Sequence, residues 1–255
     1  MNANSTPQDE YIEEGMRILR EAEKQDIVLR VMGAIAIRLR CPEFKSLHIK
    51  MEREISDIDF VGYDKQSSKI EKFFETLGYK TRILDYSFRQ VGRLIFLDPT
   101  HGRHVDVFLD KLAMCHTIDY RNRLEIHPTT VPLAEILLQK MQIVMLSDKD
   151  VKDTIVLFRE HDVGDSDGMI NIDHIAGILA NDWGFYHTVT TNLAKVSKLL
   201  PDYKHITEED REIISERIDR ALSRLEEEPK SLTWKLRSKI GTKKKWYKDV
   251  YSAPK

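Results

Sequence analysis

Short runs of apolar residues, each only a few positions long, fill the first half of the chain and alternate between two periods. Period-2 runs of β-branched and aromatic residues predict strands, and runs with an apolar stripe every three or four positions predict helices. The run at 67–78 begins with serine, carries Ile70 and Phe74 on one face and ends at a glycine, which favours a serine-capped helix. The expected elements are, in order, an amphipathic helix within the first 25 residues, a buried strand at 27–33, a helix at 34–41, a strand at 56–63, the helix at 67–78 and strands at 80–86, 92–99 and 103–110.

The pattern changes after Pro132, because every later long run shows helical periodicity. These runs lie at 131–146, 149–161, 173–200 and 208–228. The chain is therefore predicted to be α/β (α+β), with a mixed sheet and flanking helices followed by an α-helical C-terminal half. We place the expected domains at residues 1–130 and 131–255.

Composition narrows the class of protein. The 255 residues are 41% hydrophobic and 32% charged, with a formal net charge of -2, so the chain as a whole has no basic surplus for coating nucleic acid. Cys41 and Cys115 match neither a disulfide framework nor a zinc site. The polar, acidic N-terminus does not resemble a signal peptide, and the apolar runs fall short of the roughly 20 residues that cross a bilayer. We expect a cytoplasmic protein without a membrane partner.

Paired carboxylates stand out in the strand predicted at 56–63. Asp57 and Asp59 are two positions apart and would leave a strand on the same face, where their charges repel unless a proton or cation lies between them. Asp106 is a third acid, in an otherwise apolar strand, and its burial would cost free energy without a partner. If the two strands are neighbours, the three acids could hold Mg²⁺, which prefers carboxylate and phosphate oxygens. They could also lie on the solvent face of an antiparallel sheet.

The order and spacing of these residues resemble a known superfamily. The segment Gly33-Ala34, the segment Arg53-x-x-Ser56-Asp57-Ile58-Asp59 and then Val105-Asp106-Val107 resemble the polymerase-β-type nucleotidyltransferases, and within them the AbiEii-like branch of abortive-infection and toxin–antitoxin proteins. The resemblance covers residues 27–160. It implies that Gly33 is the turn that approaches a nucleoside triphosphate, that Asp57, Asp59 and Asp106 hold two Mg²⁺ ions, and that Asp106 helps to deprotonate the acceptor hydroxyl.

One position departs from that superfamily, in which a serine or threonine commonly follows the glycine turn. Here Ala34 follows Gly33, so a phosphate would rely on backbone N–H groups at the start of the next helix. Arg53 and Ser56 lie beside the acidic pair and are candidate nucleotide contacts. Arg53 could touch phosphate or pair with Asp57, and the sequence leaves both open.

The helical half offers two further candidates. Lys140 lies in an apolar helical run and Asp153 follows in the next, which resembles the lysine and aspartate motif of the same branch, where they are thought to serve nucleotide phosphates. Lys140 could instead be a side chain that extends to the rim of the apolar face. The segment 163–174 has the aspartates of a calcium loop, but Val163 and His174 occupy its two end ligand positions, so we interpret it as a loop with helix-capping aspartates.

The C-terminal segment Lys230–Lys248 holds eight basic residues and no acid, interleaved with Trp234, Trp246 and Tyr247. Basic residues with aromatic side chains suit an RNA backbone and its unstacked bases. Alternatively, the tryptophans pack on the helices, and Leu236 with them.

Together these residues predict a magnesium-dependent enzyme that moves a nucleoside monophosphate from a nucleoside triphosphate to a hydroxyl acceptor, either the 3′ end of a tRNA or a small molecule. The resemblance also admits a toxin-like role with an antitoxin-type protein partner. The alternative is a catalytically inactive nucleotide-binding or partner-binding module of the same fold.

Overall fold

The computed structural model describes residues 7–81 and 92–250, which form two compact units. The predicted strand at 80–86 therefore lies outside the described residues from residue 82 onward. The first unit comprises Met1–Arg40, Glu54–Leu112 and Ile118–Pro132. The second comprises Cys41–Arg53, Ala113–Thr117 and Leu133–Lys255. The chain therefore enters the second unit twice, at 41–53 and 113–117, before the helical half begins.

The first unit is built on a five-stranded mixed sheet in the order β1-β2-β5-β4-β3. Only β2 and β5 run parallel, while the other neighbours are antiparallel. Its elements in chain order are α1 (Pro7–Glu23), β1 (Leu29–Met32), α2 (Gly33–Arg40), β2 (Ile58–Gly62), the 3-10 turn η1 (Asp64–Gln66), α4 (Ser67–Thr76), β3 (Lys80–Thr81), β4 (Arg93–Leu97) and β5 (His104–Leu109).

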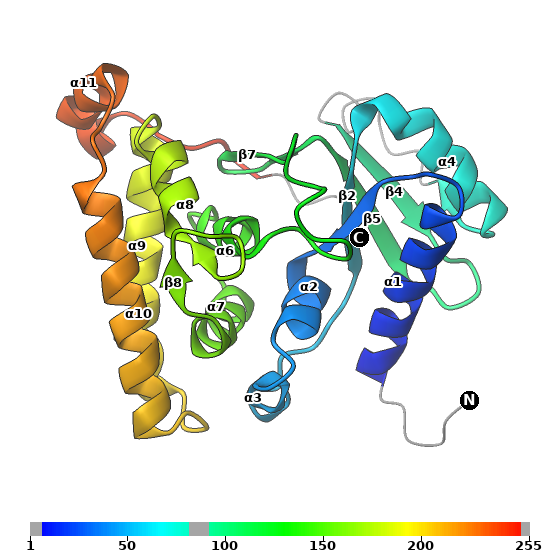
Figure 1. Cartoon of the computed structure of the whole chain (residues 1–255), viewed down its shortest axis with the longest axis horizontal. Coiled ribbons are helices and arrows are strands. Elements are labelled where there is room, and N and C mark those ends of the chain that lie inside the picture. The colour runs from blue at the N-terminus through cyan, green and yellow to red at the C-terminus, as the bar shows by residue number, and fades with distance from the viewer. Residues whose placement is uncertain (1–6, 82–91, 251–255) are drawn as a thin grey trace. The chain divides into compact units, whose positions relative to one another are not determined.

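One face of this sheet is apolar and covered by α1 and α4, which lie beside the strands in Figure 1. Ile58, Phe60 and Gly62 alternate onto that face, where Ile58 approaches Gly15 of α1 and Gly62 approaches Ile70 of α4. On α4, Phe74 stacks on Phe96 of β4 with ring centroids 4.1 Å apart. Because successive side chains point to opposite faces, the residues between them, Asp59 among these, belong to the other face.

The second unit is mainly helical. Its elements are α3 (Lys45–Lys50), α6 (Leu133–Met141), α7 (Asp148–Glu160), β8 (Val163–Gly164), β9 (Ile170–Asn171), α8 (Ile172–Leu179), α9 (Trp183–Leu199), the 3-10 turn η2 (Leu200–Asp202), α10 (Glu208–Glu227), α11 (Leu232–Ile240) and the 3-10 turn η3 (Gly241–Lys243). A hairpin of β6 (Lys111–Ala113) and β7 (Thr117–Asp119) joins residues of both units. The predicted mixed sheet, flanking helices and helical C-terminal half are confirmed.

Several local predictions were wrong, each for a physical reason. The cap of α4 is Gln66, whose side chain makes no capping hydrogen bond, and Ser67 is the first helical residue. The run at 173–200 is broken because Asp182 caps a new helix by accepting from Phe185 N–H at 3.0 Å. In the loop at 163–174 the residue that caps α8 is Asn171, which accepts from His174 N–H at 3.0 Å, and not an aspartate. The polar connection before β2 contains α3, and the C-terminal basic segment contains α11, both of which the sequence analysis did not identify.

In the described part of the chain, no helix combines the length and the apolar composition required to span a bilayer.

Candidate active site

Two of the predicted acids are direct neighbours in the sheet of the first unit. Asp59 on β2 and Asp106 on β5 are register partners across the single parallel pair of strands. Partners in a parallel pair point to the same face, so both carboxylates leave the sheet on the face opposite α1 and α4. Asp106 is 8% exposed, and a buried carboxylate needs a cation or hydrogen-bond donors beside it.

The glycine turn meets the first of these acids. Gly33 follows β1 directly, begins α2 and has φ +66°, a conformation that favours glycine. A Cβ placed on Gly33 would lie 2.7 Å from Asp59 Oδ2, closer than a carbon and an oxygen can approach without displacement. Any side chain at residue 33 would therefore occupy the space next to the Asp59 carboxylate.

Arg93 is a site residue that the sequence analysis missed. It lies on β4, where it donates from Nη2 to Asp106 Oδ2 at 2.6 Å and from Nε to Asp106 Oδ1 at 3.2 Å. Its guanidinium carbon also lies 5.0 Å from the centroid of the Phe108 ring. The only sequence signal was an arginine at the start of a strand, and its meaning depends on the antiparallel register that places Arg93 opposite Phe108.

The remaining predicted residues of this unit lie around the carboxylate pair. Asp57 precedes β2 by one residue and is half-buried, and Ser56 is exposed. Ala34 is the second residue of α2. Within residues 7–81 and 92–250, no group of three or more acidic, histidine or cysteine residues is assembled in a geometry that could hold a metal ion. The structure thus brings Asp59 and Asp106 together and does not gather Asp57 with them into a three-ligand cluster.

Substitution of Gly33 by alanine should disrupt the Asp59 carboxylate specifically. We expect Gly33→Ala to lose nucleotide and Mg²⁺ binding in calorimetry, because the added Cβ displaces Asp59, in addition to a backbone cost of about 1–2 kcal/mol at positive φ. Gly102→Ala is the matched control, since Gly102 has φ +69° but nothing lies within 4 Å of its added Cβ. Equal binding by the two variants would show that the close approach to Asp59 is irrelevant.

The other predicted residues meet in the second unit, around one buried carboxylate. Asp153 on α7 is 0% exposed and accepts from Arg53 Nε at 2.9 Å and from Arg53 Nη2 at 2.8 Å. Lys140 Nζ lies 2.8 Å from the same carboxylate, and His48 Nε2 lies 3.2 Å from it. Of the two roles left open for Arg53, neither included this partner, which is 100 residues away along the chain.

The charges of this cluster stabilise one another. Burial alone would raise the pKa of Asp153, but Lys140, His48 and Arg53 outweigh burial and hold that pKa well below its usual range. Burial likewise disfavours the charge on Lys140, yet attraction to Asp153 and Asp150 raises its pKa. The three residues predicted to contact a nucleotide are therefore an internal ionic network of α3, α6 and α7, and contact with a nucleotide stays a prediction.

The aromatic residues of the basic segment pack against α9. Trp246 Nε1 donates to Thr188 Oγ1 at 3.0 Å, and a Cβ on Gly184 would lie 2.6 Å from the Trp246 carbonyl oxygen. Trp234 makes an edge contact with Tyr186 at 5.3 Å between ring centroids. Leu236, the residue considered for the core, is 65% exposed. The tryptophans thus belong to the packing of the second unit, and the predicted RNA contact stays a prediction.

Thr188 also links this packing to a buried histidine with a shifted pKa. His116 Nε2 lies 2.8 Å from Thr188 Oγ1, and its ring stacks on Phe185 with centroids 4.8 Å apart. Burial lowers the pKa of His116 from 6.5 to about 4. Between these two values the unfolded chain binds more protons than the folded chain, so stability falls as the pH falls from about 6.5 to about 4.

We expect the second unit to lose on the order of 2 to 3 kcal/mol of stability across that pH range through His116. His116→Gln should flatten this pH dependence, because glutamine does not titrate. Urea unfolding at a series of pH values, followed by tryptophan fluorescence, measures the effect, with the exposed His205→Gln as control. A pH profile that is the same in both variants would contradict the assignment.

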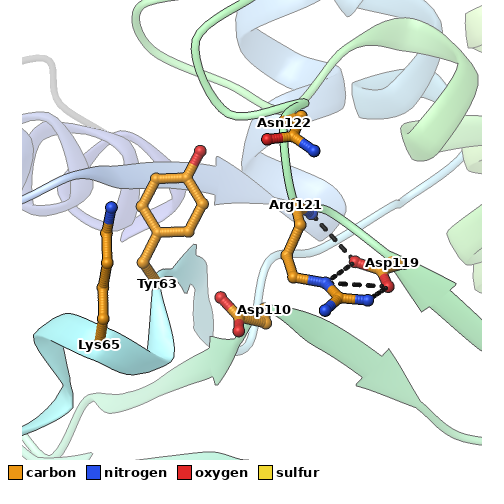
Figure 2. A pocket seen from close by; sticks show the side chains of 6 residues that line it. All are labelled: Tyr63, Lys65, Asp110, Asp119, Arg121 and Asn122. Carbon is orange, nitrogen blue, oxygen red and sulfur yellow. Dashed lines mark hydrogen bonds and ion pairs between the residues drawn. The ribbon is translucent and has the colours of Figure 1, made fainter.

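A separate charged depression of about 400 Å³ lies at the opposite ends of β2 and β5 (Figure 2). It is lined by Tyr63, Lys65, Asp110, Asp119, Arg121 and Asn122. Its charges are largely satisfied by one another: Asp119 accepts from Arg121 Nε at 2.9 Å, and Asp110 accepts from Asp64 N–H at 3.1 Å. This depression is not part of the carboxylate site, because the two lie at opposite ends of the same strands.

Comparisons with known proteins give structural likenesses only. No protein-family model matches the chain, and no curated protein matches it. Three solved structures resemble it in part. The antibiotic-resistance factor ANT(2'')-Ia is 12% identical with a TM-score of 0.40 and covers 86% of this chain and 96% of its own. An antigenic nucleotidyltransferase-like protein from Paracoccidioides brasiliensis is 14% identical with a TM-score of 0.42 and covers 88% and 95%. The lincosamide antibiotic adenylyltransferase LnuA is 15% identical with a TM-score of 0.32 and covers 44% and 69%. With TM-scores this low, the function is inferred below from the residues of the chain itself.

Proposed function

We propose that the chain is a magnesium-dependent nucleotidyltransferase that moves a nucleoside monophosphate from a nucleoside triphosphate to a hydroxyl acceptor. The observation that carries this proposal is the pairing of Asp59 with Asp106 on adjacent parallel strands, with Gly33 against the Asp59 carboxylate. Two carboxylates on one sheet face beside a side-chain-free turn suit a triphosphate that arrives with its own cation.

The donor set fits magnesium. Mg²⁺ prefers oxygen ligands, keeps several waters and is commonly held by one or two carboxylates together with substrate phosphates. Asp59 and Asp106 would supply the two carboxylates, and Asp57, two residues before Asp59, would contribute to a second ion. When bound, the metal would add Lewis-acid stabilisation of the charge that develops on the phosphate. Arg93 adds positive charge on the same face, which suits an anionic substrate.

The residues of this site can be assigned roles in the transfer. The acceptor hydroxyl oxygen forms a bond to the α-phosphorus while the bond from that phosphorus to the bridging oxygen breaks, and pyrophosphate leaves with the electron pair. The hydroxyl proton passes to a carboxylate of the pair, for which Asp106 is the candidate. Gly33 and the backbone N–H groups that begin α2 would approach the phosphates, because Ala34 offers no hydroxyl. The acceptor would be either a small hydroxyl compound or the 3′ end of a tRNA.

Isothermal titration of the full chain with each nucleoside triphosphate, with and without Mg²⁺, tests the binding half of the proposal. We expect one triphosphate to bind only when Mg²⁺ is present, and Asp59→Asn to abolish that binding. If no triphosphate gives magnesium-dependent heat, the carboxylate pair is not a nucleotide site and the proposal fails.

Two observations favour a second candidate, a module that binds nucleotide without turnover. Ala34 lacks the hydroxyl that commonly contacts the phosphates in the superfamily the sequence resembles, and Arg93 engages both oxygens of Asp106. Incubation with α-labelled triphosphates, tRNA and small hydroxyl compounds separates the two candidates. Label that is transferred by the native chain supports the enzyme, whereas magnesium-dependent binding without transfer supports the module.

A further inference from the structure

Helix α11 exposes a stripe of aliphatic side chains. Leu232, Leu236 and Ile240 follow one another at intervals of four residues, so they lie on one face of the helix on successive turns. Their exposed fractions are 79%, 65% and 45%. Single exposed aliphatic residues are ordinary on protein surfaces, but three in a row on one nine-residue helix form a continuous apolar ridge.

The opposite side of α11 is fixed to α9, so the stripe faces outward. Trp234 contacts Tyr186, and the Arg237 guanidinium carbon lies 4.7 Å from the centroid of the Trp183 ring. Ser231 caps the helix by accepting from Trp234 N–H, and its own N–H donates to the Ala180 carbonyl at 3.0 Å. With its aromatic and arginine side chains held against α9, the helix has a definite inner and outer face.

Cationic side chains flank this stripe. Lys235 and Lys239 are exposed and precede Leu236 and Ile240 by one position each, and Lys243 and Lys244 follow the helix. Segment Lys230–Lys248 contains no acid at all. We name Leu232, Lys235, Leu236, Lys239 and Ile240 the α11 surface. It combines an aliphatic ridge with a positive border, so its occupant must be both apolar and anionic.

Three occupants fit this chemistry poorly. A second copy that packed α11 against α11 would bring the lysines of both copies together. Protein interfaces are depleted in lysine, and their strongest contacts favour Trp, Tyr and Arg over Leu, whereas here the tryptophan and arginine face inward. Single-stranded RNA binds through aromatic platforms, and the exposed residues of the α11 surface are aliphatic.

An anionic lipid surface fits each feature. A helix that lies in the membrane interface buries an apolar face at the acyl boundary while its lysines reach the headgroups. Basic residues near the bilayer are attracted by acidic lipids, so the surrounding lysines would add to the binding. We propose that the α11 surface docks the chain peripherally on membranes rich in anionic phospholipid, independently of nucleotidyl transfer. The sequence analysis expected no membrane partner, because it did not identify α11 as a helix.

Co-sedimentation of the full chain with vesicles tests this proposal. The probes are vesicles of phosphatidylcholine alone and vesicles of phosphatidylcholine and phosphatidylserine in equal amounts. We expect the native chain to bind the second kind at least roughly tenfold more tightly than the first, and high salt to weaken the binding. A triple variant with Leu232→Gln, Leu236→Gln and Ile240→Gln should lose roughly a hundredfold or more of the affinity.

The matched control is Ile49→Gln with Met145→Gln, since both residues are exposed apolar side chains of the second unit outside α11. For the charges, Lys235→Gln with Lys239→Gln should weaken binding, whereas Lys195→Gln with Lys198→Gln on α9 should not. All these side chains are exposed, so the variants should fold, which circular dichroism checks. The proposal is overturned if the native chain binds neither kind of vesicle, or if the triple variant binds as well as the native chain. It is equally overturned if the triple glutamine change converts a dimer to a monomer in sedimentation or abolishes binding to tRNA, because the ridge would then belong to a second copy or to RNA.

Discussion

Asp153→Asn should lower the free energy of unfolding of the second unit by about 3–5 kcal/mol. The change keeps the shape of the side chain but removes the charge that Arg53 and Lys140 share in the interior. Lys140 has a side chain only 10% exposed, so its ammonium would be left without sufficient compensation. All three tryptophans of the chain, Trp183, Trp234 and Trp246, belong to this unit, so urea unfolding followed by tryptophan fluorescence measures it directly.

The matched control is Asp173→Asn, which removes an exposed partner of Arg224 in the same unit. Exposed ion pairs contribute roughly 0–1 kcal/mol, so we expect little change. If Asp153→Asn is no more destabilising than Asp173→Asn, the buried cluster does not stabilise the unit, and its residues would be free to serve another purpose.

Asp59→Asn and Asp106→Asn should each reduce nucleotidyl transfer by roughly a thousandfold or more. Loss of a carboxylate that holds the metal removes several kcal/mol of transition-state stabilisation, and each 1.36 kcal/mol changes the rate about tenfold. The measurement is pyrophosphate release from the triphosphate that binds, in the presence of a mixture of hydroxyl acceptors. Asparagine retains the size of aspartate, so circular dichroism should show the fold unchanged.

Asp64→Asn is the control for this pair, because Asp64 is an exposed aspartate just beyond the other end of β2. We expect it to transfer at the native rate. Retention of most of the activity in both Asp59→Asn and Asp106→Asn would remove the catalytic proposal even if nucleotide still binds.

The elements of the fold were largely predictable because each long run carries one clear period. β2, for example, alternates between apolar side chains and Asp59, and α4 carries its apolar stripe within residues 67–78. The short elements were missed, since α3 has six residues and α11 lies in a segment dominated by its lysines. In α11 the apolar residues point to solvent, so its pattern does not report burial.

The site was predictable only as far as residue types reveal it. Two aspartates two positions apart, and one more in an apolar strand, already indicate chemistry, and the parallel pairing of β2 with β5 sets Asp59 against Asp106. Arg93 could not be found in this way, because its bond to Asp106 depends on a register that no local pattern encodes. Arg53 and His48 were equally hidden, because their partner Asp153 follows more than a hundred residues after His48 along the chain.

Segment Cys41–Arg53 leaves the first unit and returns to it, and during that excursion it delivers Arg53 and His48 to Asp153. The chain therefore cannot be divided with one cut. A fragment that stops at residue 132 would carry two basic side chains made for a carboxylate it no longer contains, and the complementary fragment would expose Asp153 and Lys140 without them. Gene fusions, circular permutations and isolated-domain expression should respect this excursion, and a ribosome must finish α7 before the early arginine finds its partner.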